Sequence, residues 1–119
     1  MAPAPLVDVT YAPDVAESTL RELGSVLPHL VSEAVKCPEE PYDGNLQPGD
    51  VEIRFRALGP LDRSGLNVVI EIKSKWFQSR AANQQERVNK LREAIRSATR
   101  LSGFGVYLSL PLAAWAQDP

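Results

Sequence analysis

Residues 50–74 read DVEIRFRALGPLDRSGLNVVIEIKS and contain two segments of alternating apolar and polar side chains. Apolar side chains fall at every second position of 50–58 and of 67–74, at Val51, Ile53, Phe55 and Ala57 and then at Val68, Ile70 and Ile72. A two-residue period is that of a strand with one face buried. Residues 59–65 contain Gly59, Pro60 and Gly65, which favour a turn. We therefore predict two consecutive strands joined by this turn.

The sequence before this stretch predicts a strand and a helix. Residues 6–11 are rich in strand-forming side chains. From residue 15 onward apolar side chains recur at steps of three and four, at Ala16, Leu20, Leu23, Leu27, Leu30 and Ala34. This is the stripe of an amphipathic helix, with Asp14 as its expected N-cap. Pro28 removes one backbone donor, so the helix is either kinked there or restarted at Ser25, and the unbroken stripe favours a kink.

The sequence after the stretch repeats this order. Polar residues 79–84 are followed by apolar positions at helical spacing, Val88, Leu91, Ile95, Ala98 and Leu101. They predict a second helix that stops at Gly103, and residues 104–110 predict a fourth strand. The tail at 111–119 contains Leu112 and Trp115, which need an apolar surface such as a partner subunit to cover them. Proline and glycine between residues 37 and 50 predict a long loop.

The element order is β-α-β followed by β-α-β. It predicts an α+β fold of two fused β-α-β units, with a four-stranded sheet and two helices on one face. We expect one domain over 1–119, made of a leader at 1–4, a first half at 5–58, a second half at 67–110 and the tail at 111–119. The other face of the sheet must be solvated, bind a ligand or pack on another subunit.

Composition excludes several classes of protein. With 44% hydrophobic and 24% charged residues in 119, the chain is too apolar for intrinsic disorder and too charged for a membrane span. The first residues, MAPAP, lack the basic cluster and apolar core of a secretory signal, so we expect a cytoplasmic protein. One cysteine, Cys37, and one histidine, His29, exclude an internal disulfide and disfavour a structural metal. The net charge of −2 argues weakly against a nucleic-acid binder.

Short motifs in this order resemble the tautomerase superfamily, above all its longer chains of the macrophage migration inhibitory factor and carboxymethyl-hydroxymuconate isomerase type. Residues 5–9, PLVDV, look like the family's opening strand, which begins with a proline. Lys36 precedes a proline-containing loop, as the family's active-site lysine does. Residues 72–75 resemble the end of the family's third strand, and Tyr107 lies in a strand similar to the one that carries the active-site tyrosine. Arg54 resembles a strand arginine of the isomerase group.

The resemblance implies a tautomerase or isomerase that moves a proton on a small keto or enol acid without metal or organic cofactor. It implies a homotrimer whose sites lie between subunits. In the family the base is an N-terminal proline, a secondary amine whose pKa is brought near neutrality. The resemblance places Pro5 in this role, with the carboxylate-bearing substrate held by Lys36, Arg54, Lys75 and Tyr107.

One departure from the family keeps an alternative open. Four encoded residues precede Pro5, and while Ala4 remains attached the Pro5 nitrogen is a tertiary amide without basicity. The alternative is a non-catalytic, oligomeric binding or interaction protein of the same fold. Ser109 also stands where the migration inhibitory factor strand has asparagine, and Glu52 where the isomerases have arginine.

The basic run of the second helix is interpreted as a solvated face. It consists of Arg80, Arg87, Lys90, Arg92, Arg96 and Arg100. RNA-recognition motifs share the βαββαβ order, but the aromatic residues near Tyr107 lie on the last strand and lack a second stacking aromatic. We therefore expect neither a nucleic-acid partner nor a membrane.

Overall fold

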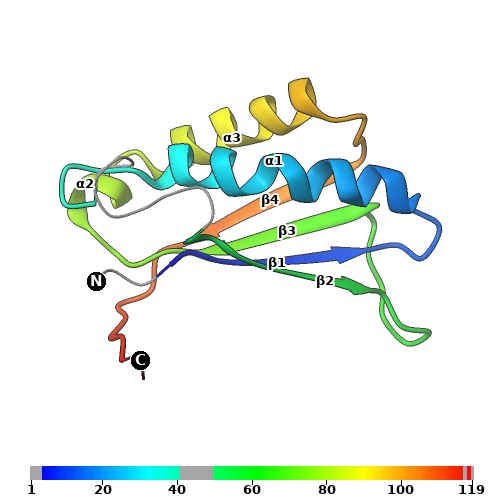
Figure 1. Cartoon of the computed structure of the whole chain (residues 1–119), viewed down its shortest axis with the longest axis horizontal. Helices are drawn as coiled ribbons and strands as arrows, with labels where there is room; N and C mark the ends of the chain where they lie inside the picture. Colours follow the sequence, from blue (N-terminus) through cyan, green and yellow to red (C-terminus); the bar gives the residue numbers. More distant parts are fainter. Residues whose placement is uncertain (1–3, 41–49, 117, 119) are drawn as a thin grey trace.

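A computed structural model describes residues 4–40, 50–116 and 118, and Figure 1 shows its strands side by side in one sheet. The strands are β1 (Leu6–Tyr11), β2 (Glu52–Ala57), β3 (Val68–Lys73) and β4 (Phe104–Ser109). The sheet order is β2-β1-β3-β4, with β1 and β3 antiparallel at the centre. The edge strand β2 runs parallel to β1, and β4 runs parallel to β3. The predicted α+β fold is confirmed.

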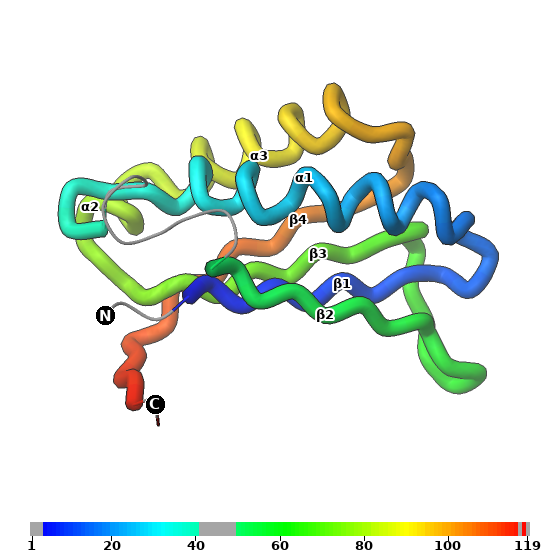
Figure 2. Tube along the Cα trace, viewed as in Figure 1, coloured from blue at the N-terminus to red at the C-terminus, as the bar shows by residue number. Residues whose placement is uncertain are grey.

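The helices are α1 (Glu17–Val35), α2 (Gln78–Ala81) and α3 (Gln84–Ala98). Figure 2 follows the chain through two halves of the same plan, β1-α1-β2 and β3-α3-β4. The predicted turn between them is present, since the amide of Gly59 donates to the Asp62 carboxylate at 2.7 Å. The short α2 was not predicted, and of the predicted loop at 37–50 only residues 37–40 and 50 lie among the described residues.

Helix α1 is continuous through Pro28, so it does not restart at Ser25. Its N-cap is Ala16 in extended conformation, which makes the prediction of Asp14 as the cap wrong. The fully buried face is formed by Leu23, Leu27, Val31, Ser32 and Val35. The hydroxyl of Ser32 donates to the carbonyl of Pro28 at 2.8 Å, so this buried polar group is satisfied within the helix.

Helix α3 ends earlier than predicted. Its C-cap is Thr99, so Gly103 does not stop the helix. Gly103 instead has a φ of 63° immediately before β4. This backbone conformation favours glycine, and a Cβ here would lie 2.7 Å from Nδ2 of Asn67, so a larger residue would also displace the Asn67 side chain.

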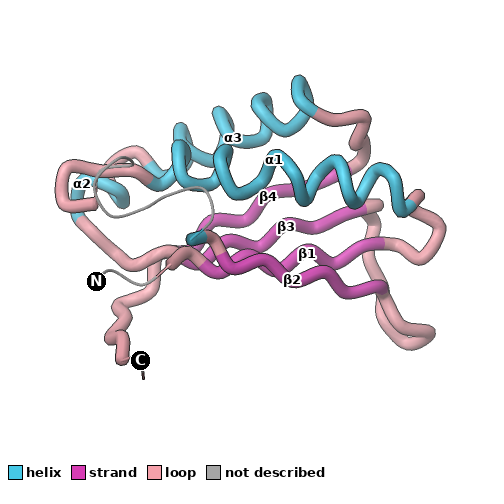
Figure 3. Tube along the Cα trace, viewed as in Figure 1, coloured by secondary structure: helices cyan, strands magenta, loops and turns pink. Residues whose placement is uncertain are grey.

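The core lies between the helices and one face of the sheet. Figure 3 shows α1 and α3 over the same face, and none of the described helices covers the opposite one. Val7 and Val9 of β1 and Ile70 and Ile72 of β3 point into this core and are at most 1% exposed. Strand β2 buries less than its alternation predicted, because it is an edge strand whose Phe55 remains 39% exposed. Among the described residues no helix is both long and apolar enough to cross a membrane.

Candidate functional site

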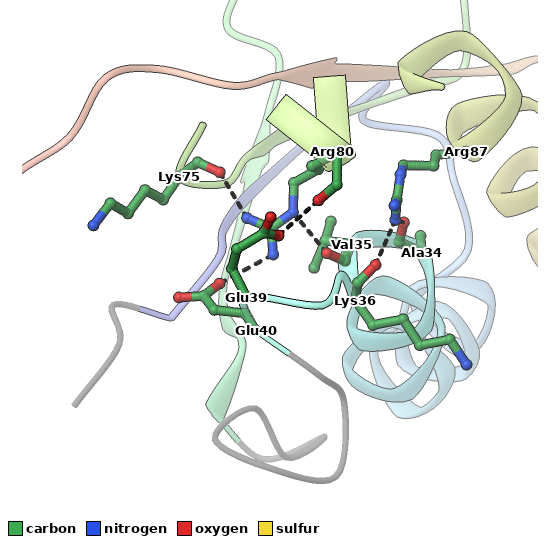
Figure 4. A network of polar contacts seen from close by, with 9 residues as sticks. Ala34, Val35, Lys36, Glu39, Glu40, Lys75, Arg80 and Arg87 are labelled. Atoms are coloured by element: carbon green, nitrogen blue, oxygen red, sulfur yellow. Dashed lines mark hydrogen bonds and ion pairs between the residues drawn. The ribbon is translucent and has the colours of Figure 1, made fainter. Parts of the chain in front are cut away.

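Arg80 lies at the centre of the polar contacts at one end of the molecule (Figure 4). At this end β1 begins, and β3, β4 and α1 end. The Arg80 side chain is fully buried, in the single turn of α2. Its Nε donates to the Val35 carbonyl and its Nη1 to the Lys75 carbonyl, both at 2.6 Å. Nη2 pairs with the Glu40 carboxylate at 3.0 Å. One guanidinium therefore ties together the end of α1, the segment after β3 and the turn at 37–40.

A second arginine, Arg87, binds backbone carbonyls at the same end of α1. Nη1 of Arg87, on α3, donates to the carbonyls of Ala34 at 2.9 Å and Lys36 at 2.7 Å. Its Nε donates to Oδ1 of Asn83 at 2.6 Å. The last carbonyls of a helix have no partner within the helix, so these contacts satisfy groups that otherwise need water.

Sequence reasoning missed these two arginines, because it assigned both to a solvated basic face. The interpretation holds for Lys90, Arg92, Arg96 and Arg100, which are exposed. It is wrong for Arg80, which is buried, and for Arg87, which is half-buried. A signal for Arg87 was present, since it stands one turn before Leu91 and two before Ile95 on the buried stripe. We find no comparable signal for Arg80.

Pro5 and Lys75 lie at this end, Pro5 just before β1 and Lys75 just after the neighbouring strand β3. Leu6 pairs with Lys73 in the register of β1 and β3, so one further step places Pro5 opposite Ser74. Pro5 is buried, and its carbonyl accepts a hydrogen bond from the Glu52 amide at 3.0 Å. Its nitrogen is bonded to Ala4 in this chain, so it carries no proton and no free lone pair.

The candidate residues Lys36 and Lys75 lie at the same end of the molecule, but their side chains point in different directions. Figure 4 shows the side chains of Lys36 and Lys75 extending away from Arg80 on different sides. Nζ of Lys36 pairs with the Glu33 carboxylate at 2.7 Å, on the helix layer. Nζ of Lys75 lies 5.5 Å from the centre of the Phe77 ring, a cation–π contact.

Arg54 and Tyr107 lie on the open face of the sheet. Arg54 pairs with Asp8, Asp8 with Glu71 and Glu71 with Tyr107, so all four form one row across the strands. Arg54 and Tyr107 stand at its two ends, on the edge strands, and Tyr107 is 67% exposed. Three strand spacings separate them, roughly 14 Å. A single chain therefore does not bring Arg54 and Tyr107 into contact with one small substrate.

One carboxyl group at this end has a shifted pKa. The hydroxyl of Ser79 donates to the Glu39 carboxylate at 2.6 Å, and this hydrogen bond is the main reason why the pKa of Glu39 lies below its ordinary value. The next residue, Glu40, is the buried partner of Arg80. Within residues 4–40 and 50–116, no group of three or more histidine, cysteine, aspartate or glutamate side chains is arranged to hold a metal ion.

Solved structures with this architecture are known. A structure of malonate semialdehyde decarboxylase has a TM-score of 0.65 at 13% identity, covering 96% of this chain and 91% of that chain. A fused 4-OT symmetric trimer has a TM-score of 0.61 at 11% identity, covering 89% and 85%. A macrophage migration inhibitory factor-like protein from Entamoeba histolytica has a TM-score of 0.59 at 15% identity, covering 96% and 95%.

These likenesses establish the fold. The three similar proteins are members of the tautomerase superfamily, and the chain has the fold of that superfamily. The resemblance drawn from the sequence is confirmed at this level. No family model matches the sequence, and no curated protein matches it either.

Proposed function

We propose that the chain is a tautomerase- or isomerase-like protein, which moves a proton on a small keto or enol acid when processing makes Pro5 the N-terminal residue. The observation that carries the proposal is the place of Pro5. It is buried immediately before the central strand β1, in a fold shared with isomerases and decarboxylases. Burial disfavours the protonated form of an amine, so a Pro5 amine at this place would be available as a base near neutral pH.

In this proposal Pro5 is the base, the cations bind the substrate, and Tyr107 donates a hydrogen bond. The Pro5 amine removes a proton from the carbon beside the substrate's carbonyl group and returns it to another carbon or to oxygen. Cations of Lys36, Arg54 or Lys75 hold the substrate carboxylate and stabilise the negative charge that develops on the enolate oxygen. The phenol of Tyr107 donates a hydrogen bond to the same oxygen.

We further propose that the working unit is a homotrimer. Arg54 and Tyr107 stand on opposite edge strands of one sheet, so a second copy is needed to place both beside one substrate. The similar fused 4-OT structure is a symmetric trimer, which supports this arrangement. The exposed tail residues Leu112 (87%) and Trp115 (51%) supply apolar surface for contact with a second copy. Light scattering at micromolar concentration should give a trimer mass, and a monomer would contradict the proposal.

The experiment that tests the function compares two chains. In one, the initiating methionine is followed directly by Pro5, so that its removal exposes the amine. In the other, Ala4 is retained. Incubation with phenylpyruvate in D₂O, followed by proton NMR, should show catalysed exchange of the C3 protons only with the first chain. Equal exchange rates in both chains, or none above buffer in the first, would contradict a role of Pro5 as the base.

Substitutions then test whether Lys36 and Arg54 bind the substrate carboxylate. Lys36→Ala and Arg54→Ala should each raise KM for such a substrate, because each removes a carboxylate partner. Arg56→Ala is the matched control for Arg54, since it lies on the same strand and face, two residues further along β2. Unchanged kinetics in both variants would remove Lys36 and Arg54 from the site.

A second candidate is favoured by the covalent structure around Pro5. The peptide bond from Ala4 makes the Pro5 nitrogen an amide, and a chain that keeps this bond has no proline base. Such a chain would serve as an oligomeric binding or interaction protein of the tautomerase fold. It would still form trimers but would not exchange phenylpyruvate protons.

A further inference from the structure

A cavity of about 370 Å³ lies between α1 and α3, and every residue that lines it belongs to these helices or to their caps. Its apolar lining comes from Leu30 and Ala34 of α1 and from Leu91 and Ala94 of α3. This volume is at the lower end of the range typical of small-molecule sites. The lining favours a ligand with an apolar body of modest size.

Cations dominate the polar lining of the same cavity. Lys36, Arg87 and Lys90 line it together with a single acid, Glu33. Lys90 is paired with Glu86 at 3.1 Å, outside the lining, and both of these side chains are largely exposed. Glu33 is paired with Lys36, and both side chains remain partly exposed, at 39% and 55%. Such exposed pairs contribute little stability, so an incoming anion can take the place of Glu33 or Glu86 at small cost. The cavity therefore carries a surplus of positive charge.

Arg87 is the fixed part of this surplus. Its guanidinium is held by the carbonyls of Ala34 and Lys36 and by the side-chain oxygen of Asn83, all of them neutral acceptors. Within the described part of the chain no carboxylate pairs with Arg87. The group is thus held in position before any ligand binds, and its charge is not neutralised by a partner.

We propose that this cavity binds a small amphipathic carboxylate, with the apolar body on Leu30, Ala34, Leu91 and Ala94 and the carboxylate against Arg87 and Lys90. Charge complementarity selects this occupant over a neutral or cationic amphiphile. The proposal does not depend on Pro5 or on any catalytic activity. It shares Lys36 with the proposed active site, so Lys36 is not used to test it.

The test uses octanoate as the probe and the full chain labelled with ¹⁵N. Titration should shift the amide signals of residues around the cavity saturably, with a dissociation constant of roughly millimolar or tighter. Octanol and octylammonium have the same apolar chain without the negative charge, and both should bind more weakly. Equal binding of the three probes would overturn the proposal, because charge would then play no part. Shifts confined to the sheet face, or no saturable shifts, would overturn it as well.

Substitutions in the cavity lining test whether octanoate binds there. Lys90→Glu should weaken octanoate binding about fivefold, whereas Arg96→Glu, the same charge reversal on α3 outside the cavity lining, should leave it nearly unchanged. Ala94→Phe fills the apolar part and should abolish binding of octanoate. Ala94 and Lys90 lie near the surface, so both substitutions should leave the fold intact. The NMR spectrum of each variant verifies that it is folded. Equal losses in Lys90→Glu and Arg96→Glu would show attraction to net charge alone and would contradict the assigned cavity.

Discussion

The two halves of the molecule share a topology but contribute differently to it. Helix α1 has 19 residues and a continuous buried face, whereas α3 has 15 residues, of which only Leu91 and Ile95 are buried. The second half instead supplies polar anchors, since Arg80 and Arg87 satisfy three consecutive carbonyls at the end of α1. Of the two helices, α1 therefore provides more of the apolar core, whereas the second half fixes the end of the molecule at which Pro5 lies.

The largest expected effect comes from removing the buried anchor. Arg80→Met breaks the pair with Glu40 and leaves its carboxylate buried without a partner. Breaking such a pair costs about 3 to 5 kcal/mol. Urea unfolding should show this loss. Arg96→Met, at an exposed position of α3, is the control and should change the free energy of unfolding by less than about 0.5 kcal/mol.

A double variant separates the buried charge from the other contacts of Arg80. Arg80→Met combined with Glu40→Leu removes both charges, so it should lose less stability than Arg80→Met alone. A loss below about 1 kcal/mol in the single variant, well under the usual cost of a broken buried pair, would contradict the anchoring role.

The next effect concerns the unequal burial of α1 and α3. Val31 on α1 is fully buried, whereas Val88 on α3 is only half-buried. Val31→Ala should cost about 1.5 to 3 kcal/mol because it leaves a cavity in the core, and Val88→Ala less than about 1 kcal/mol. Thermal or urea unfolding of the two variants measures the difference. Equal losses would show that the two helices contribute alike to the core.

The smallest effect concerns the carboxyl group beside the buried pair. Ser79→Ala removes the hydrogen bond that lowers the pKa of Glu39, so this pKa should rise toward its ordinary value. A lowered folded-state pKa adds stability at neutral pH that is lost as the pH falls through that pKa, so the variant should lose less stability on acidification. NMR titration of the Glu39 carboxyl carbon measures the shift. Ser97→Ala, at an exposed position of α3, should leave it unchanged.

Periodicity predicted the fold well because it reports burial on one face of a strand or helix. The alternation of 67–74 gave β3 and its buried side chains, and the stripe of α1 continued through Pro28 as expected. Helix ends were less predictable. Helix α1 begins after Ala16 and not after the predicted cap Asp14, and helix α3 ends at Thr99 and not at Gly103. The backbone geometry that sets these two boundaries is not visible in the composition.

The candidate site could be predicted only as a set of residues, not as an arrangement. The motif likeness located Pro5 and Lys75, which the strand register brings to the same end of the sheet. It did not reveal that Arg54 and Tyr107 stand on opposite edges, since strand order depends on the whole topology. Arg80 was missed because burial of an arginine requires partners from separate segments, here Val35, Glu40 and Lys75.

Pro5 can act as the base only when it is the N-terminal residue, so the N-terminus of the mature protein decides the proposed function. Intact mass and N-terminal sequencing of the untagged protein, purified from the cells that naturally make it, should give a chain that begins at Pro5. A mature chain beginning at Met1 or Ala2 would contradict the claim, because Ala4 would then still block the Pro5 nitrogen.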